Sequence, residues 1–282
     1  MRDFQVLFDH AEPAELPDPA MAPYGNLGFP TPSAGKPWVY ANFVQTLDGI
    51  VSLLGDEAGG ADIAGLPEDR WLMDLLRAHA DAVILGMGTL REEQKMARPR
   101  ARGPVFRIVD PALQQLRVKL HRGRERNVLV TARAEFQMSD YAVFDGDLVD
   151  VTVVTSRQGA QRLERQHNPI VDILAVDALP AGGLDLRQAV DSLHQRHGIR
   201  YLLCEGGPGL YSAMLTASLI DERFVTVSPI EVGGMSASGP RPTMLPGVGF
   251  SKENAVHSHW LSCRKLGDHQ FHRFRRKVAG VC

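Results

Sequence analysis

Residues 76–89 read Leu-Arg-Ala-His-Ala-Asp-Ala-Val-Ile-Leu-Gly-Met-Gly-Thr, and they are the best guide to the architecture. The middle of this stretch is a short apolar run, Ala82–Leu85, with the length and composition of a buried strand. The run ends in Gly86-Met87-Gly88-Thr89. We therefore predict a buried parallel strand that leads into a glycine loop, where Thr89 adds a hydroxyl.

A helix is predicted just before this strand. Pro67-Glu68-Asp69 suits its first turn, because proline gives up an N–H that this turn leaves unpaired and acids favour the positive end of the helix dipole. Four residues at helical spacing define the buried face: Leu72, Leu75, Leu76 and His79. Three charged residues are expected largely elsewhere on the helix: Arg70, Asp74 and Arg77.

The same pattern occurs again near residue 200. A second apolar run, 199–204, leads into Glu205-Gly206-Gly207-Pro208 and then into a helix that carries Leu210, Met214 and Leu215. In an open α/β sheet, ligands bind beyond the carboxyl ends of the strands, and glycine lets backbone N–H groups approach a phosphate. Either glycine segment alone is also compatible with a plain turn. Neither is a GxGxxG fingerprint, so a Rossmann dehydrogenase is disfavoured.

The rest of the chain alternates short strands and helices. Residues 38–44 and the apolar runs 105–109, 127–131, 151–155, 170–176 and 224–227 fit further strands, separated by polar connections. Asp185 caps a helix that extends to His197, and Gly198 ends it. Residues 255–266 and 270–277, joined at Gly267-Asp268, form a β-hairpin signature. The fold class is therefore α/β, with a mostly parallel central sheet, flanking helices and an antiparallel C-terminal hairpin.

The N-terminal stretch differs from the rest. Residues 1–37 carry seven prolines, at 13, 17, 19, 23, 30, 32 and 37, and cannot form a regular helix or an inner strand. We expect an extended arm ahead of one domain, residues 38–282. Two alternatives remain open: a disordered tail, or an arm that packs on the body or on a partner subunit through its apolar residues.

Composition limits the function classes. The formal net charge is −2 and the isoelectric point is near 6.6, so nothing favours nucleic acid or an acidic membrane as the main partner. The three cysteines, Cys204, Cys263 and Cys282, are too few and too scattered for a disulfide framework. No apolar run has the length of a signal peptide or a transmembrane helix, and a cytoplasmic location is expected.

Three segments resemble one family, in order over about residues 38–277. Residues 41–49, Ala-Asn-Phe-Val-Gln-Thr-Leu-Asp-Gly, are similar to its N-F-x-x-S-L-D-G motif. Residues 76–89 are similar to its L-R-A-x-x-D-A-x-x-x-G-x-x-T segment. Residues 205–208, with Leu219-Ile220-Asp221-Glu222 and Pro229, resemble its E-G-G-P, L-x-D-E and P positions. The family is the pyrimidine reductase domain of riboflavin biosynthesis, which has a dihydrofolate-reductase-like fold.

The resemblance implies a homodimer that uses NADPH to reduce the ribose of a ribosylaminopyrimidine 5′-phosphate. By position, the cofactor-binding residues are Ala41, Asn42, Gly86, Gly88, Thr89, Thr131, Gly206, Gly207 and Leu210. Thr46, Asp48 and Glu205 would face the substrate, and the carboxylates of Asp48 and Glu205 would stabilise positive charge that develops during hydride transfer. Without the resemblance, Asp48 is a turn former and Glu205 a helix-end acid.

Two departures from the family concern the substrate half of the site. The lysine that commonly follows the Leu-Asp-Gly turn is Ile50 here, and the usual phosphate-binding pattern is missing from residues 90–100. Arg91, Arg98 or Arg100 could replace it, because arginine binds phosphate bidentately. A charged surface loop is the alternative. The zinc deaminase signature that often accompanies such reductases is also missing.

Other functions remain open. A dihydrofolate or pterin reductase usually has a carboxylate on the first helix after its first strand, and Asp69 and Asp74 are the candidates here. A non-catalytic nucleotide- or flavin-binding protein fits the loss of lysine at Ile50, and a structural subunit would use the arm for assembly. His257, His259 and Cys263 share a strand face near His269 and His272, but their spacing matches no standard metal site, and no metal is expected.

Overall fold

The computed structural model describes residues 2–53, 60–96, 102–180, 182–237 and 239–277. The strands of the main sheet are β1 (Gln5–Asp9), β2 (Trp38–Gln45), β3 (Ala82–Gly86), β4 (Arg126–Val130), β5 (Asp150–Ser156), β6 (Val171–Val176), β7 (Tyr201–Cys204), β8 (Glu222–Val227), β11 (Ser258–Leu266) and β12 (His269–Arg276). A separate two-stranded ribbon contains β9 (Met235–Ser236) and β10 (Gly239–Pro240). The helices are α1 (Gly60–Ala64), α2 (Pro67–His79), α3 (Met87–Met96), α4 (Pro111–Lys119), α5 (Arg157–Glu164), α6 (Leu186–His197) and α7 (Pro208–Thr216).

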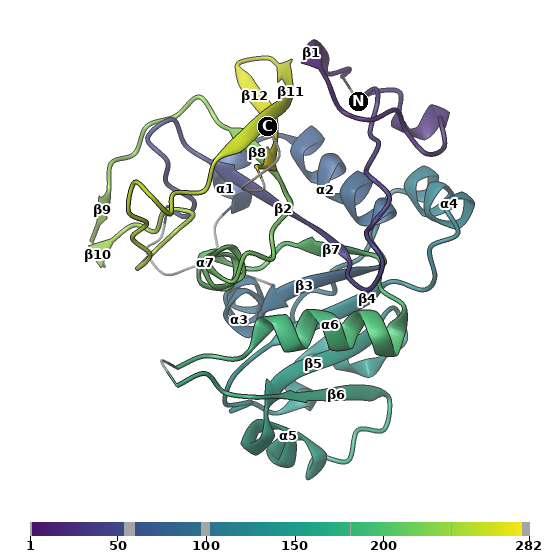
Figure 1. Ribbon diagram of the computed structural model, residues 1–282, viewed down its shortest axis with the longest axis vertical. Coiled ribbons are helices and arrows are strands. Elements are labelled where there is room, and N and C mark those ends of the chain that lie inside the picture. The colour runs from purple at the N-terminus through teal and green to yellow at the C-terminus, as the bar shows by residue number, and fades with distance from the viewer. Residues whose placement is uncertain (1, 54–59, 97–101, 181, 238, 278–282) are drawn as a thin grey trace.

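The main sheet has ten strands in the order β1-β11-β12-β8-β2-β7-β3-β4-β5-β6 (Figure 1). From β8 to β6 all neighbouring strands are parallel, whereas β12, β11 and β1 continue the sheet in antiparallel fashion. This arrangement confirms the predicted α/β class with a mostly parallel sheet and an antiparallel C-terminal hairpin. The hairpin turns at Gly267, whose φ of 57° is in the left-handed region.

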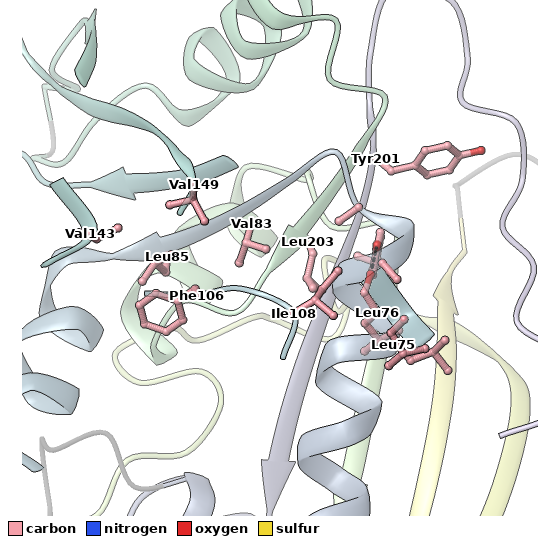
Figure 2. Packing of buried hydrophobic residues seen from close by; sticks show 14 of the residues in the cluster. Leu75, Leu76, Val83, Leu85, Phe106, Ile108, Val143, Val149, Tyr201 and Leu203 are labelled. Atoms are coloured by element: carbon pink, nitrogen blue, oxygen red, sulfur yellow. Dashed lines mark hydrogen bonds between the residues drawn. The ribbon is translucent and has the colours of Figure 1, made fainter. Parts of the chain in front are cut away.

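The two faces of the sheet bury separate hydrophobic clusters. Alternate residues along β3 show this, because Val83 and Leu85 join the cluster beneath α2 and α4, whereas Ala82 and Ile84 join the cluster beneath α6 and α7. Figure 2 shows part of the first cluster, in which Leu75 and Leu76 of α2 lie beside residues of β3 and β7. A central sheet buried on both faces explains why its strands read as continuous apolar runs.

Helix α6 begins and ends where the sequence predicts. The Asp185 side chain accepts hydrogen bonds from the backbone N–H groups of Arg187 and Gln188, and Gly198 closes the helix with a φ of 65°. In contrast, two of the polar connections are helices, α4 and α5. Helix α4 carries a recognisable signal, since the Asp110 side chain caps it and Pro111 occupies its first position.

The prediction of a strand at residues 105–109 is wrong. These residues follow an irregular extended path, and side chains satisfy their backbone groups instead of a neighbouring strand. Asn127 receives the N–H of Phe106 at 3.1 Å and donates to its carbonyl at 2.7 Å. Glu125 accepts the N–H of Ile108 at 2.9 Å. An apolar run alone cannot distinguish such a segment from a strand.

The N-terminal residues pack on the body of the molecule. Strand β1 pairs with β11 at the edge of the sheet, and four apolar side chains of the arm are buried: Phe4, Met21, Tyr24 and Leu27. Buried arginines of the C-terminal hairpin contact the arm through hydrogen bonds and a cation–π interaction. Arg264 donates to Asp9 at 2.7 Å and its guanidinium lies 3.9 Å from the Tyr24 ring centroid, while Arg273 donates to the Gly28 carbonyl.

The buried His79 makes the stability of the folded protein depend on pH. Burial, with Arg122 and Arg273 nearby, lowers the pKa of His79 from 6.5 to about 4, and its Nδ1 lies 3.0 Å from the Leu75 carbonyl oxygen. The unfolded chain therefore binds a proton that the folded chain excludes as the pH falls from 6.5 to 4. We expect a loss of stability on the order of 3 kcal/mol over this window.

Urea denaturation at pH 7 and pH 4.5 measures this loss. A His79→Leu variant should lose less stability than the wild type between the same two pH values. An equal loss in both proteins would assign the acid sensitivity to other groups.

Among the described residues, no helix combines the length and the apolar character that a bilayer span requires.

Candidate functional site

A large cavity lies at the carboxyl ends of the central parallel strands. Its volume is about 1530 Å³, and its wall includes residues beyond β2, β7, β3 and β4, which are neighbours in that order in the sheet. Segments 182–187 and 242–248 contribute further wall residues. This is the edge at which open α/β sheets bind ligands.

Helices α3, α6 and α7 begin at the cavity wall, where Met87, Leu186 and Pro208 are lining residues. The first turn of a helix has backbone N–H groups without partners inside the helix, and these groups favour anions. Asp185 caps α6 with its own carboxylate, whereas α7 begins after Gly207 without any side-chain cap. The start of α7 therefore presents backbone donors to this part of the cavity.

The two predicted glycine segments meet in the structure. Gly207 donates its N–H to the Thr89 hydroxyl at 2.8 Å. A Cβ at Gly206 would lie 2.6 Å from Leu210 Cδ2 and 3.0 Å from Leu85 Cα, so only glycine allows β7 and β3 to approach this closely. The prediction of a loop at Gly86–Thr89 is wrong, because β3 leads directly into α3 at Met87.

The cavity wall contains most of the residues that the resemblance links to a cofactor. They are Asn42, Gly86, Gly88, Thr89, Thr131, Gly206, Gly207 and Leu210. Ala41 is different, because it is fully buried in the cluster beneath α6 and α7 and does not line the cavity. Thr131 follows β4, and its hydroxyl accepts the N–H of Ala134 at 3.3 Å.

Asn42 and Gly88 are the lining residues that most clearly leave room for a ligand. The side-chain oxygen of Asn42 is buried and has no hydrogen-bond partner among the described residues. A buried polar atom without a partner is costly, so a ligand that donates a hydrogen bond here would be favoured. At Gly88, a Cβ would meet no atom within 4 Å. The open space beside this glycine belongs to the cavity.

Glu205 lines the cavity but is bound on both oxygens by Arg77. The Arg77 Nε and Nη2 atoms lie 2.7 and 2.6 Å from the two Glu205 oxygens, and Nη1 lies 3.2 Å from Asp74. Burial opposes the charge of Arg77, but the Glu205 and Asp74 carboxylates outweigh it and raise its pKa. The expectation that Asp74 and Arg77 lie away from the buried face is wrong, because the ion pairs let both be buried.

Thr46 and Asp48 form a turn outside the cavity wall. Asp48 is exposed, and its carboxylate accepts the Thr46 hydroxyl at 2.5 Å and the N–H of Gly233 at 2.6 Å. These hydrogen bonds, the Thr46 hydroxyl first, lower the pKa of Asp48. Ile50 is buried and forms a β-bridge with Thr243. The contacts of Asp48 are those of a turn-forming residue.

Of the three candidate phosphate-binding arginines, only Arg91 lies within the described residues. It is part of α3, and its Nη2 donates to the Glu135 carbonyl at 3.2 Å. Arg91 does not line the cavity. Arg98 and Arg100 lie outside the described residues.

The histidines considered above as metal ligands include two whose ring nitrogens lie within hydrogen-bond distance of protein oxygens. The Nε2 of His269 lies 2.9 Å from the Ala64 carbonyl oxygen, and the Nε2 of His272 lies 2.9 Å from the Gln270 side-chain oxygen. Cys263 is buried in β11. In the part of the chain that the structure describes, no three His, Cys, Asp or Glu side chains gather closely enough to hold a metal ion.

Sequence reasoning missed one part of the cavity wall and named another, Asp69, only as one of two candidate carboxylates for a dihydrofolate or pterin reductase. Gly182 and Gly183 line the cavity and precede the Asp185 cap of α6. They belong to a third strand–glycine–helix segment, which can be recognised in the sequence. Asp69 also lines the cavity, although it does not stand out in the sequence from the other acids of α2. Only its tertiary position distinguishes it.

Comparison with known proteins identifies the family. The family model of the RibD C-terminal domain matches residues 37–271. The chain is similar to proteins named 2,5-diamino-6-ribosylamino-4(3H)-pyrimidinone 5′-phosphate reductase from two archaea. It is 27% identical to that of Archaeoglobus fulgidus over 77% of this chain and 90% of the relative. It is 26% identical to that of Methanothermobacter thermautotrophicus, over 77% and 87%.

Among solved structures, RibD of Acinetobacter baumannii superimposes with a TM-score of 0.62 at 19% identity. The match covers 87% of this chain and 59% of that one, so this chain corresponds to only part of the longer protein. At this identity the likeness shows the dihydrofolate-reductase-like fold alone. The family model spans well over half of the sequence, from the start of β2 into β12. The chain therefore belongs to the RibD C-terminal domain family.

Proposed function

We propose that this protein is an NADPH-dependent reductase of a ribosylaminopyrimidine 5′-phosphate. The names of the two archaeal relatives support the reaction and the substrate class. The observation that carries the proposal is the cavity at the carboxyl ends of β2, β7, β3 and β4, at which α3, α6 and α7 begin. A cavity of about 1530 Å³ has room for a dinucleotide beside a second ligand.

The lining residues fit a nicotinamide dinucleotide. The uncapped start of α7 would hold a phosphate, with Gly88 leaving room for close approach. Asn42 would accept a hydrogen bond on its orphaned side-chain oxygen. Thr89 and Thr131 would line the same cleft. When bound, this group supplies the hydride, and the protein supplies orientation and a dry wall.

We assign Glu205 to the substrate-facing wall, where its carboxylate is paired with Arg77, a cation that it shares with Asp74. Because this pairing offsets part of its charge, Glu205 would stabilise positive charge on a substrate less than a free carboxylate could. Catalytic roles for Glu205 and Asp48, with Thr46 beside the substrate, are part of the proposal, as is phosphate binding by Arg91, Arg98 or Arg100. The turn contacts of Asp48 favour Glu205 of the two carboxylates.

The proposal also covers the domain organisation and the oligomeric state of the protein. Residues 38–282 would form the reductase domain and residues 1–37 its arm, in a cytoplasmic homodimer that needs no nucleic acid or membrane. The mass in solution from light scattering tests the dimer. A monomer at micromolar concentration would argue against it.

NADPH-induced thermal shift tests the cofactor. We expect NADPH, and not NADH, to stabilise the wild type by about 3 kcal/mol at 100-fold excess over the dissociation constant. A Gly88→Ala variant should weaken NADPH binding at least about tenfold, because its methyl group would occupy cavity space, while the first turn of α3 gains about 0.5–1 kcal/mol in stability.

A matched control is Gly123→Ala, where a Cβ also meets no atom within 4 Å but the residue lies outside the cavity wall. This variant should bind NADPH as the wild type does. Absence of any shift in a folded wild type would contradict the reductase proposal. A full shift in Gly88→Ala would contradict the assigned position of the cofactor.

A further inference from the structure

Asp69 is a buried carboxylate in the cavity wall that no arginine or lysine neutralises among the described residues. It lies in the first turn of α2 and is 6% exposed. One oxygen, Oδ1, accepts a 2.7 Å hydrogen bond from the Thr226 hydroxyl of β8. Within the described part of the chain, no hydrogen-bond donor contacts Oδ2. Asp69 Oδ2 therefore retains acceptor capacity although the side chain is almost buried.

Asp69 differs in this respect from two other acids of α2, which form ion pairs with arginine. Glu68 is held by Arg2, with Nε 3.1 Å from Oε1, and Asp74 is held by Arg77 at 3.2 Å. No such ion pair holds Asp69 among the described residues, and the Nε2 of His269, which acts on Asp69 electrostatically, lies 2.9 Å from the Ala64 carbonyl oxygen. Burial, opposed by the Thr226 hydrogen bond and by His269, raises the pKa of Asp69. A buried acceptor of this kind is stabilised by a ligand that donates to it.

The position of Asp69 separates it from the proposed cofactor cradle. Thr226 belongs to β8, on the far side of β2 from β7, β3 and β4. The helix starts at Gly86–Thr89 and Gly206–Leu210 follow β3 and β7 instead. The wall that contains Asp69 also contains the apolar residues Val44, Leu66 and Met73, and Arg70, whose guanidinium lies 3.9 Å from Asp74. A flat ring at this end would be packed by apolar side chains and oriented by one carboxylate.

The chemistry of a carboxylate beside a flat ring defines the complementary ligand. Two carboxylate oxygens pair best with two adjacent N–H donors, as in the edge formed by a ring N–H and a neighbouring amino group. The pyrimidinone in the names of the archaeal relatives has such an edge, with an amino group at C2 and a hydrogen on N3. The corresponding uracil has oxygen at C2, and this acceptor would face the carboxylate without a proton between them.

We propose that Asp69, positioned by Thr226, recognises the 2-amino and N3–H edge of the substrate ring and selects the 2-aminopyrimidinone against the corresponding uracil. This inference rests on the proposed function, because it concerns the substrate of the same site. It makes Asp69 a specificity-determining residue that the family resemblance does not include. Thr226 is a positioning residue, since its hydroxyl holds one carboxylate oxygen.

Steady-state kinetics of the full chain with NADPH and each of the two pyrimidines tests the inference. The wild type should favour the 2-amino compound by about 100-fold or more in kcat/KM, because the uracil leaves buried polar groups unpaired. Asp69→Asn should invert this preference. An amide offers one acceptor for N3–H and one donor for the C2 oxygen, which matches the uracil edge.

Two further variants separate recognition from structure. Glu68→Gln changes the adjacent acid, which lies outside the cavity wall, and should keep the wild-type selectivity. Thr226→Val should reduce the selectivity about tenfold, mainly through KM, while thermal melting confirms that each variant folds. Selectivity that is the same in Asp69→Asn and the wild type would overturn the inference.

Equilibrium binding separates failure of the inference from failure of the proposed function. If a folded wild type oxidises no NADPH with either pyrimidine, the reductase proposal fails. Calorimetric titration of the same two compounds then still measures the preference of Asp69. Tighter binding of the 2-amino compound, inverted in Asp69→Asn, would support recognition, and equal binding of both compounds would refute it.

Discussion

Replacing Arg77 with methionine is expected to lower the free energy of unfolding by about 3–5 kcal/mol. The Arg77 side chain is 1% exposed, and its guanidinium pairs with the buried carboxylates of both Glu205 and Asp74. Methionine retains much of the apolar stem but leaves the Glu205 carboxylate without its cation and Asp74 with only the exposed Arg70, 3.9 Å away. The loss should therefore exceed that of an ordinary core substitution, and urea denaturation followed by circular dichroism measures it.

Arg70→Met is the matched control on the same helix. Its side chain is 55% exposed and lies 3.9 Å from Asp74, so its removal should cost less than about 1 kcal/mol. Adding Glu205→Gln to Arg77→Met should recover part of the stability, because the double variant no longer buries that unpaired charge. If Arg77→Met and Arg70→Met cost the same, the buried ion pairs are not important for stability.

Replacing Tyr24 with alanine should destabilise the protein by about 3–5 kcal/mol, as for other large aromatic truncations in cores. Tyr24 is 2% exposed although it lies in the proline-rich arm. Its ring meets Phe4 edge-on at 5.4 Å and lies 3.9 Å beneath the Arg264 guanidinium. Alanine removes this packing and the cation–π contact together.

Leu7→Ala provides the comparison within the arm. Leu7 is 53% exposed in β1, and its truncation should change stability by no more than about 0.5 kcal/mol. Chemical denaturation should show one transition for Tyr24→Ala by both circular dichroism and tryptophan fluorescence, because the arm shares its core with the body. A small loss in Tyr24→Ala, similar to that in Leu7→Ala, would mean that the arm is a loosely attached segment.

Local signals in the sequence were sufficient for most of the fold. The Asp185 cap and Gly198 define α6, Gly267 defines the hairpin turn, and the apolar runs that end in glycine define β3 and β7. Each of these signals acts within a few residues, through backbone geometry or hydrogen bonds to the nearest turn. The same kind of signal, the Asp110 cap followed by Pro111, marks the start of α4.

Part of the candidate site was also accessible from the sequence. Glycine segments that follow parallel strands converge at one sheet edge whatever the details of packing, and the cavity wall does include Gly86, Gly88, Gly206 and Gly207. The contact between them was not predictable. The hydrogen bond from Gly207 to Thr89 joins residues 118 positions apart, and no local pattern encodes it.

The charged residues of α2 show what the sequence by itself could not determine. Helical spacing established the apolar face, but no local pattern shows that Asp69, Asp74 and Arg77 are buried. Their roles depend on Thr226 of β8 and on Glu205 after β7, which only the folded sheet brings to α2. A charge can be buried where a distant partner or ligand compensates for its lost hydration, so tertiary structure decides which charges become parts of a site.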